Sequence, residues 1–313
     1  MSDPAVDAVI RQVSNWGRWG AEDELGTLNH ITDRVRADAA ATVDTGQAFS
    51  LALELSRNGP QPAGDRRLNP QHVMLQTGTD LCLGVQQGSI DGWGYADDMV
   101  SMALQCATHW DALAHAFYDY RMYNDRDARL VDVHGAARNG IHNATGRVAT
   151  RGVLLDVARF LGHDWLPLDH AIAPQELQAC AEAEGVELRA GDAVIVRTGN
   201  LGRARAGGGW ERYTYDDEPG LSLDCLPWLH ERAVAAVATD TWALEVMPSG
   251  TSIMLPIHAA GIVHMGLTLG ENFVLDPLAE HCARTGRYTF FFVCDPLPFV
   301  GAVGSPIAPL AIF

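Results

Sequence analysis

The stretch Gln105-Cys-Ala-Thr-His109-Trp-Asp111-Ala-Leu-Ala-His115 concentrates polar side chains in a segment that is otherwise apolar. Five of its side chains can bind or serve a metal ion: Gln105, Thr108, His109, Asp111 and His115. Zinc and manganese accept imidazole nitrogens and carboxylate oxygens, and a catalytic site leaves one position for water or substrate. A single histidine on such a segment is more often an ordinary core or surface residue, but this combination favours a metal site.

The neighbouring residues predict how these side chains are presented. Asp98 to Gln105 has the pattern of a strand, and alternate side chains of a strand share one face, so His109 and Asp111 are expected to point the same way. His115 lies four residues after Asp111, which would place the two on one face if the chain turned helical there. We interpret Cys106 as a small buried residue of the strand rather than as a nucleophile.

A second cluster can supply the ligands that a metal site usually takes from distant parts of the chain. The apolar stretch from Pro256 to Asn272 contains His258 and, thirteen residues later, Glu271. Both could instead be solvated residues at the ends of a helix or strand. The nearby His264 shows that not every histidine here needs a function.

Composition limits the class of protein. The chain has 313 residues, of which 47% are hydrophobic and 19% charged, as in an ordinary globular protein with a sizeable core. Its formal net charge of −17 argues against nucleic acid or an anionic membrane as a partner, because phosphate contacts need clustered cations. All 22 basic residues are Arg, which excludes a lysine Schiff base and a P-loop.

The cysteines and the apolar runs predict the compartment. The six cysteines are scattered without a C-x-x-C spacing, so neither a zinc ribbon nor a dithiol redox motif is expected. No signal-like segment follows Met1, and no apolar run approaches 18 residues. We therefore expect a reduced, soluble, cytoplasmic protein.

The order of elements predicts an α/β fold with a β-rich mixed sheet. Residues 1–46 are expected to form an N-terminal helical arm, and residues 47–313 a single domain. The arm should contain a helix from Pro4 to before Trp16, a turn-rich segment at 15–26 and a second helix that begins after Thr32 and ends near Gly46. The expected strands lie at 48–55, 72–76, 99–105, 153–156 and 193–197, and further helices at 174–184, 223–232 and 277–285. The loop from Ser56 to Pro70, rich in Pro and Gly, is the best candidate for a mobile lid.

The stretch from Gln105 to His115 resembles the His-x-Gly-Thr-His-x-Asp-x-Pro-x-His signature of the cyclase-like metal-dependent hydrolases. That family includes bacterial kynurenine formamidase, isatin hydrolase and enzymes named polyketide cyclases. The resemblance covers most of the chain, through Asn15-Trp-Gly-Arg-Trp-Gly, Tyr123-Asn124, Arg151-Gly-Val-Leu-Leu-Asp156, Gly191-Asp-Ala-Val, Arg197-Thr-Gly199, Asp240-Thr241, His258 with Glu271, and Gly304-Ser-Pro-Ile-Ala-Pro309. It implies the family's swivelling β/β/α fold.

Three positions depart from that signature. Gln105 stands where the family has its first His, Ala107 where it has Gly, and Leu113 where it has Pro. A Gln at the first position is similar to a subgroup that includes trans-dienelactone hydrolase, a zinc enzyme, and so is the interval from His258 to Glu271. Since an amide oxygen is a weak zinc ligand, one divalent ion is expected rather than two, with zinc favoured over manganese.

The resemblance also implies roles for individual residues. His109, Asp111, His258 and Glu271 would hold the ion, and Gln105 would be a weak ligand or would orient the attacking water. His115 would be the acid/base that takes a proton from that water and returns it to the leaving atom. Two further residues could support the ligands or be ordinary loop caps: Thr108 and Asp240.

Candidates for substrate contacts are less specific. Aromatic side chains could line a pocket but are more often core residues: Trp16, Trp19, Trp110, Phe117, Tyr118, Tyr123 and Trp242. Arg66, Arg67 and Arg121 could pair with a substrate carboxylate, although solvated surface positions are the simpler interpretation.

These patterns together predict a metal-dependent hydrolase that opens the C–O or C–N bond of a lactone, a cyclic amide or an arylformamide. Two alternatives remain: a polyketide-type cyclase or dehydratase that uses the metal to polarise a ketone, and a metal-free small-molecule binding protein on the same fold. The expected partner is a small-molecule substrate. A homodimer or homotetramer is also expected, in which the Trp-bearing segment 15–26 crosses to a neighbour.

Overall fold

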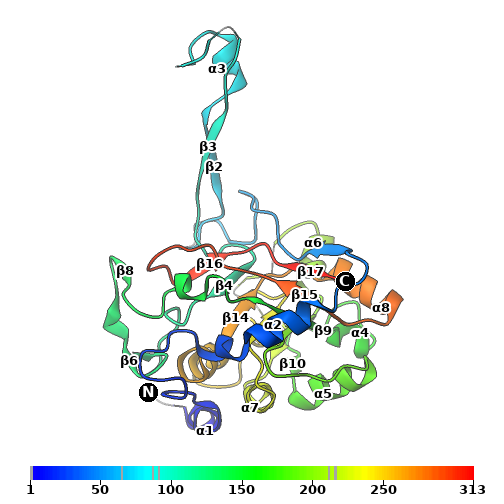
Figure 1. The fold of residues 1–313 in the computed structure, drawn as a ribbon. Coiled ribbons are helices and arrows are strands. Elements are labelled where there is room, and N and C mark those ends of the chain that lie inside the picture. The colour runs from blue at the N-terminus through cyan, green and yellow to red at the C-terminus, as the bar shows by residue number, and fades with distance from the viewer. Residues whose placement is uncertain (1–2, 65, 87, 91, 211, 215–216) are drawn as a thin grey trace.

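The computed structural model describes the chain except for residues 1–2, 65, 87, 91, 211 and 215–216. Within the described residues the main sheet has nine strands (Figure 1). Their order across the sheet is β1 (Ala48–Ser50), β17 (Leu310–Ile312), β15 (Thr289–Val293), β9 (Ala149–Leu155), β11 (Ala193–Val196), β13 (Ala236–Thr239), β14 (Thr268–Glu271), β4 (His109–Asp111) and β16 (Gly304–Pro306). The predicted α/β fold with a mixed sheet is confirmed.

The sheet is parallel in its centre and antiparallel at both edges. Strands β9, β11, β13 and β14 run parallel, while β15, β17 and β1 continue the sheet antiparallel on one side and β4 and β16 on the other. Buried parallel strands read as continuous apolar runs, as in Ala193–Val196. The candidate motif therefore lies on an antiparallel strand at the edge of the parallel core.

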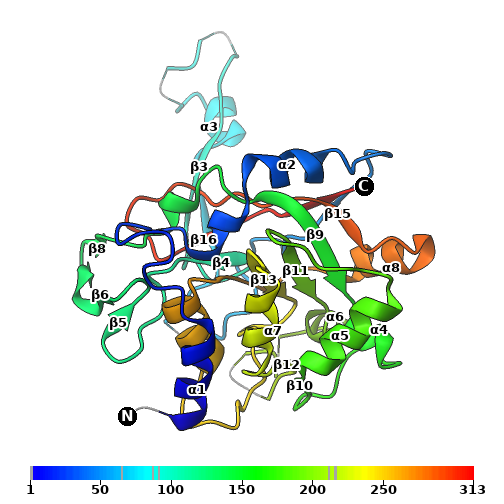
Figure 2. The ribbon, with the colours of Figure 1, turned by 60° about the horizontal axis from the view of Figure 1, so that its bottom comes forward.

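Alternate residues of the central strands pack into two hydrophobic cores, one on each face of the sheet. Val153 and Leu155 pack into one core with α1 (Pro4–Val13), α5 (Pro174–Ala183), α7 (Cys225–Glu231) and the π-type helix η4 (His258–Met265). Figure 2 shows α1, α5 and α7 on the same side of the sheet. Leu154 packs into the other core, together with residues of the short helices η1 (Gly26–His30) and η3 (Ile141–Ala144), of α8 (Asp276–Thr285) and of β15. This two-sided burial is what the period-2 geometry of a strand requires.

The remaining elements are short. The helices are α2 (Asp33–Ala40), α3 (Gly78–Cys82), η2 (Ala128–Leu130), α4 (Val157–Phe160) and α6 (Asn200–Ala206). Two-stranded ladders pair β2 (Gln71–Gln76) with β3 (Asp97–Ser101), β5 (Arg121–Met122) with β6 (Arg126–Asp127), β7 (Val131–Asp132) with β8 (Gly135–Ala136), and β10 (Ala171–Ile172) with β12 (Gly220–Leu221). No helix among the described residues is long and apolar enough to cross a membrane.

The capping residues and apolar patterns of the sequence predicted the positions of several helices correctly. Asp3 accepts a hydrogen bond from the backbone N–H of Ala5 at the start of α1, and Thr32 accepts one from Val35 at the start of α2. The predicted helices at 174–184, 223–232 and 277–285 correspond to α5, α7 and α8. The second helix was predicted too long, because α2 ends at Ala40 and only turns and bends continue toward Gly46.

The prediction that a strand leads into the motif is wrong. Strand β3 ends at Ser101 and pairs with β2 in a hairpin that stands away from the body, with α3 near its tip (Figure 1). From Met102 the chain leaves the ladder, and the backbone N–H of Cys106 donates to the carbonyl of Ala103 in a turn. The strand that carries the motif is β4, only three residues long. The predicted strand at 48–55 is likewise shorter, ending at Ser50.

The N-terminal segment packs on its own chain. Helix α1 contacts η4 and α7, and α2 contacts β9 and β15. The indole N–H of Trp16 donates to the carbonyl of Val263 at 2.7 Å, and its ring stacks on His264 at 4.4 Å. These contacts cover Trp16 within one subunit. The division into an arm of residues 1–46 and a domain of residues 47–313 stays a prediction.

Candidate metal centre

Strand β4 presents His109 and Asp111 on one face and turns Trp110 to the other. The indole of Trp110 is 1% exposed and donates to the carbonyl of Cys294 at 2.8 Å, so it belongs to the core and not to a substrate pocket. On the neighbouring strand β14, Glu271 lies in register with His109. Three candidate ligands therefore share one sheet surface, because the alternation of a strand fixes their direction.

The fourth candidate ligand, His258, comes from the first residue of η4. Its Nδ1 lies 2.8 Å from Glu245 Oε2, and the other carboxylate oxygen of Glu245 accepts the backbone N–H groups of Ile257 and His258 at 3.0 and 3.3 Å. Since a carboxylate only accepts hydrogen bonds, Nδ1 carries the proton and Nε2 offers its lone pair. The carbonyl of Ala107, 2.8 Å from His109 Nδ1, fixes His109 in the same tautomer.

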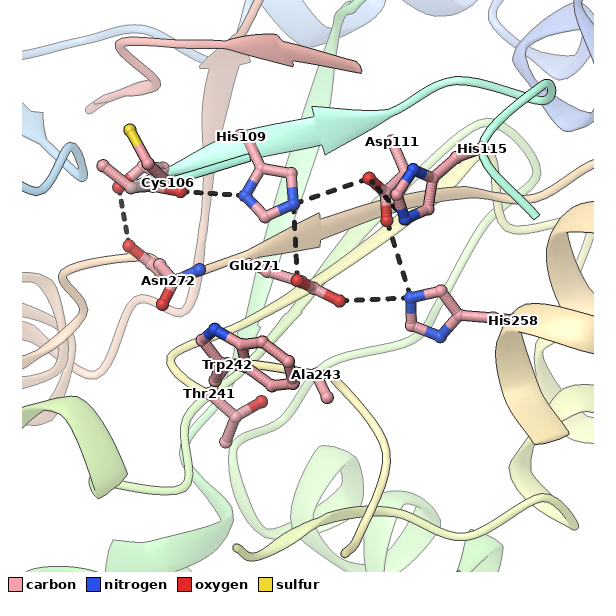
Figure 3. A network of polar contacts seen from close by, with 12 residues as sticks. Cys106, His109, Asp111, His115, Thr241, Trp242, Ala243, His258, Glu271 and Asn272 are labelled. Carbon is pink, nitrogen blue, oxygen red and sulfur yellow. Dashed lines mark hydrogen bonds and ion pairs between the residues drawn. The ribbon is translucent and has the colours of Figure 1, made fainter. Parts of the chain in front are cut away.

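The two Nε2 atoms converge on the two carboxylates (Figure 3). His109 Nε2 lies 3.5 Å from Asp111 Oδ1 and 3.3 Å from Glu271 Oε2. His258 Nε2 lies 3.5 Å from Asp111 Oδ2 and 3.2 Å from Glu271 Oε1. At most 5% of each of these residues is exposed. Two overlapping groups are each compact enough to hold an ion: His109 with Asp111 and Glu271, and Asp111 with His115 and His258. The four residues expected from the sequence therefore lie together around Asp111, with His115 beside them.

The donor set fits a cation. His109 Nε2 and both carboxylate oxygens of Asp111 are buried without a hydrogen-bond partner. Burying such groups unpaired is costly, and two carboxylates facing two imidazole lone pairs need a positive charge between them. Burial lowers the pKa of His109, but the close contacts of its Nε2 with the negative charges of Asp111 and Glu271 outweigh this and raise the pKa to about 9. Two nitrogens and two carboxylates are suitable ligands for zinc or manganese.

His115 lies beside this set on the turn that follows β4, and the chain does not become helical there. Its Nε2 is 3.6 Å from Asp111 Oδ1, while its Nδ1 is buried without a partner. Burial lowers the pKa of His115, the charge of Asp111 partly opposes this, and the positive charges of His258 and Arg67 lower it further. A neutral imidazole at this position can accept a proton at neutral pH.

A cavity of about 1060 Å³ opens next to His115 and His258. Its wall is largely apolar and includes Phe117, Tyr118 and Met254. Two of the predicted aromatic contacts therefore lie at the cavity. Tyr123 does not line it: this residue is fully buried, with its hydroxyl donating to Asp23 Oδ2 at 2.9 Å. Ligand sites are typically concave, mostly apolar and close to a few polar groups.

Other predicted residues have structural contacts. Thr108 donates to the carbonyl of Asn272 at 2.6 Å and accepts from the N–H of Leu53. Asp240 accepts from the N–H groups of Thr198 and Gly199, both at 2.7 Å, which identifies it as a loop cap. Neither side chain has a described contact with the four candidate ligands.

Gln105 and Cys106 differ in how the structure places them. The amide of Gln105 lies against Gly304, where an added Cβ would overlap it, and Gly304 pairs with Asp111 across β16 and β4. The amide of Gln105 therefore lies next to the residue that pairs with Asp111, but it has no described hydrogen bond to the four candidate ligands. Cys106 is fully buried, as predicted, although it lies in a turn, and burial raises its pKa to about 11.

Glu245 was not among the site residues predicted from the sequence. An acidic residue within the apolar run Trp242-Ala-Leu-Glu-Val-Met247 is the signal that could have identified it. Charged side chains are almost never fully buried unless they are paired, so such a residue needs a partner. Nothing in its spacing to His258 indicates that the partner is that histidine, since the intervening segment is irregular.

The comparisons with known proteins identify the family and the fold of the chain. Residues 38–246 match the family model described as "Putative cyclase". A crystal structure titled as a novel cyclase is 34% identical, with a TM-score of 0.87 over 96% of this chain and 100% of that one. Isatin hydrolase A from Ralstonia solanacearum shares the fold at 18% identity, with a TM-score of 0.61 over 85% of this chain and 91% of that one.

A predicted metal-dependent hydrolase from Bacillus stearothermophilus also shares the fold, at 14% identity and a TM-score of 0.50 over 85% of this chain and 97% of that one. No curated protein matches the chain. The family model covers more than half of the sequence, and the expected resemblance is confirmed. The chain belongs to the cyclase family, whose fold it shares with isatin hydrolases and predicted metal-dependent hydrolases.

Proposed function

We propose that this protein is a metal-dependent hydrolase that opens the C–O or C–N bond of a lactone, a cyclic amide or an arylformamide. The observation that carries the proposal is the convergence of His109, Asp111, His258 and Glu271, with His115 beside Asp111 and at the wall of the cavity. The names of the structural relatives support hydrolysis as the reaction class.

The four converging side chains would hold one divalent ion, with zinc the first candidate and manganese the second. When bound, such an ion polarises a carbonyl and lowers the pKa of water toward neutrality. Glu245 and the carbonyl of Ala107 keep the two histidines in the tautomer that offers Nε2. Gln105 lies close enough to β16 to orient a substrate or water from the side of Asp111.

His115 supplies the proton transfer. Burial lowers the pKa of its imidazole and so favours the neutral form. The imidazole also lines the cavity, so it can take a proton from the attacking water. It then returns that proton to the leaving oxygen or nitrogen. The apolar wall at Phe117 and Met254 binds the body of the substrate and limits access of bulk water.

A panel of aryl lactones, imides and aryl formamides tests the proposal by pH-stat with the metal-loaded protein, because opening a lactone releases acid near neutral pH. His115→Ala should keep the metal and the fold and lose about 10²- to 10⁴-fold in kcat. The matched control is His264→Ala, which removes a histidine stacked on Trp16 outside the ligand set. Loss of metal in His115→Ala would instead make His115 a ligand.

Other outcomes identify the alternatives. Metal-loaded protein that hydrolyses nothing in the panel favours the cyclase or dehydratase. Protein that neither holds metal nor gains activity with added metal favours the metal-free binding protein and contradicts both enzymatic functions.

We also propose that the chain forms a homodimer or homotetramer. The support comes from the β2–β3 hairpin, whose two faces both carry exposed apolar side chains, including Val73 and Met99 on one face and Met74 and Val100 on the other. An isolated two-stranded hairpin is at best marginally stable in water, so a second copy of the chain is the expected cover. The segment 15–26, expected to cross to a neighbour, makes the contacts described above within its own chain.

A further inference from the structure

The loop from Ser56 to Pro70 is attached to the chain next to the metal centre. The side-chain amide of Gln61, 4% exposed, donates to the carbonyl of Cys106 at 3.0 Å, three residues before His109. The indole N–H of Trp242 points to the carbonyl oxygen of the same amide at 3.5 Å. Trp242 in turn packs with Cys106 and Ala107 in one buried cluster. Figure 3 shows Trp242 and Cys106 close to the candidate ligands, and Gln61 joins the loop to both of these residues.

This loop brings a guanidinium group to that place. The guanidinium carbon of Arg67 lies 5.1 Å from the centre of the Trp242 ring, in a cation–π contact. Its Nη1 is buried and has no hydrogen-bond partner. After burial, which lowers the pKa of His115 and raises that of Cys106, the positive charge of Arg67 acts on both groups: it lowers the pKa of His115 further and opposes part of the rise at Cys106.

A buried guanidinium N–H without an acceptor is costly, and planar carboxylates match its geometry best. The cavity lined by His115 and His258 offers a different electrostatic environment. Its lining includes the carboxylates of Asp7 and Asp119 and no Arg among the described residues. In a chain of net charge −17, the position beside Arg67 therefore favours an anionic group more than the part of the cavity wall near Asp7 and Asp119 does.

We propose that Arg67 binds a carboxylate of the substrate, so that the enzyme prefers lactones or cyclic amides carrying a carboxylate close to the bond that opens. The apolar body of the substrate then lies in the cavity, and the carboxylate lies between Arg67 and the metal centre. This inference rests on the proposed hydrolysis. Arg67 is thus a specificity-determining residue, and Trp242 and Gln61 hold it in place.

Two lactones that differ in one carboxylate test this with the protein loaded with one equivalent of zinc: phthalide, which is neutral, and phthalide-3-carboxylate. The wild type should have the lower KM for the carboxylated lactone. Arg67→Gln should reduce this preference about 10- to 100-fold, the range of one lost hydrogen bond to a charged group. Arg67→Lys should restore part of it, because lysine keeps the charge without the planar fork.

Arg57→Gln is the matched control, since it removes one positive charge from an exposed position of the same loop and should leave both KM values unchanged. Calorimetry of phthalate and benzoate binding to the zinc-loaded proteins gives a readout independent of turnover. Phthalate should bind more tightly than benzoate to the wild type, and this difference should vanish in Arg67→Gln.

The results separate the two proposals. If neither lactone is hydrolysed, the result contradicts the proposed hydrolysis of lactones. The calorimetric comparison of phthalate and benzoate still decides whether Arg67 binds a carboxylate. The role of Arg67 is contradicted if the wild type shows no preference for the carboxylated lactone and for phthalate. It is equally contradicted if Arg67→Gln lowers kcat for both lactones alike, which would make Arg67 a stabiliser of the transition state.

Discussion

At the scale of single residues, the centre depends on hydrogen bonds that the ligands make away from the proposed ion. Glu245 uses one oxygen to hold Nδ1 of His258 and the other to receive two backbone N–H groups, so it fixes both the ring and the start of η4. His109 has only a backbone carbonyl in the equivalent position. A hydrogen bond to a carboxylate increases the basicity of an imidazole more than a hydrogen bond to a carbonyl does. The metal affinity of His258 should therefore depend more on Glu245 than that of His109 depends on its backbone partner.

Glu245→Gln should lower the affinity for zinc about 10- to 100-fold, because the amide supports the imidazole less well than the carboxylate does. Competition with a chromophoric chelator measures this directly. Glu176→Gln is the control, since Glu176 forms a similar pair with His170 at 3.0 Å, away from the centre. An unchanged zinc affinity in Glu245→Gln would show that the Glu245–His258 contact is only structural.

Glu184, at the end of α5, makes the stability of the protein depend on pH. Burial and the negative charge of Asp156 raise its pKa to about 8, although its Oε1 accepts the N–H of Asp156 at 3.0 Å. Between an unfolded pKa near 4.5 and the folded value, the folded chain binds more protons than the unfolded chain, so stability falls as the pH rises from about 4.5 to 8.

Glu184→Gln should remove this loss and gain about 1–3 kcal/mol in the free energy of unfolding at pH 8 relative to pH 5. Urea denaturation at the two pH values measures the difference. Glu182→Gln, at an exposed position of the same helix, should show no such gain. Equal pH dependence in Glu184→Gln and the wild type would contradict a raised pKa at this site.

At the scale of elements, the precision of the centre comes from the pairing of β4 with β14. Trp110 crosses over Gly270 on the neighbouring strand, and a Cβ at Gly270 would overlap the indole and lie 2.8 Å from the Phe273 ring. Backbones and rings approach this closely only where the residue lacks a side chain. Glu271 follows directly, so a shift of β14 would move a candidate ligand.

Gly270→Ala should therefore destabilise the protein by about 1–3 kcal/mol through overpacking and weaken zinc binding as well. Chemical denaturation and a zinc titration of the same sample measure the two effects. In Gly207→Ala an added Cβ meets nothing closer than 3.5 Å at an ordinary helical φ, so neither quantity should fall. A Gly270→Ala variant as stable as the wild type would show that β14 tolerates the shift.

The β2–β3 hairpin is the element on which the proposed oligomer depends. Val73→Lys combined with Met99→Lys places charge on one exposed apolar face, because these residues pair across the hairpin. Multi-angle light scattering should give a mass of two or four chains for the wild type and a smaller mass for the double variant. Val133→Lys, at a position 96% exposed elsewhere, should keep the wild-type mass. A wild-type mass of one chain would contradict the oligomer.

At the scale of the whole molecule, the sequence predicted what local chemistry determines. The helix starts at Asp3 and Thr32 follow from capping, and the buried run at Ala193–Val196 follows from continuous apolarity. The prediction of a strand leading into the motif was wrong because the limits of a strand depend on its pairing partners. The chain up to Ser101 pairs with β2 in a hairpin, and β4 forms only where β14 and β16 lie on either side of it.

The candidate centre could be predicted in part for the same reason. His109 and Asp111 share a face of one short strand, whatever the rest of the fold does. That His258 and Glu271 meet them depends on the antiparallel register of β14 with β4 and on the start of η4, which spacing alone does not specify. The supporting role of Glu245 and the contact of Arg67 with Trp242 are tertiary, and neither follows from sequence pattern.

The central claim is that His109, Asp111, His258 and Glu271 hold one divalent ion. Calorimetric titration of the metal-stripped protein with zinc tests it most directly, with Glu271→Gln beside the wild type. We predict one zinc per chain for the wild type, and an affinity lower by at least about 10-fold in Glu271→Gln, which loses an anionic ligand. Binding of no zinc by the wild type, or of one zinc with equal affinity by both proteins, would contradict the account.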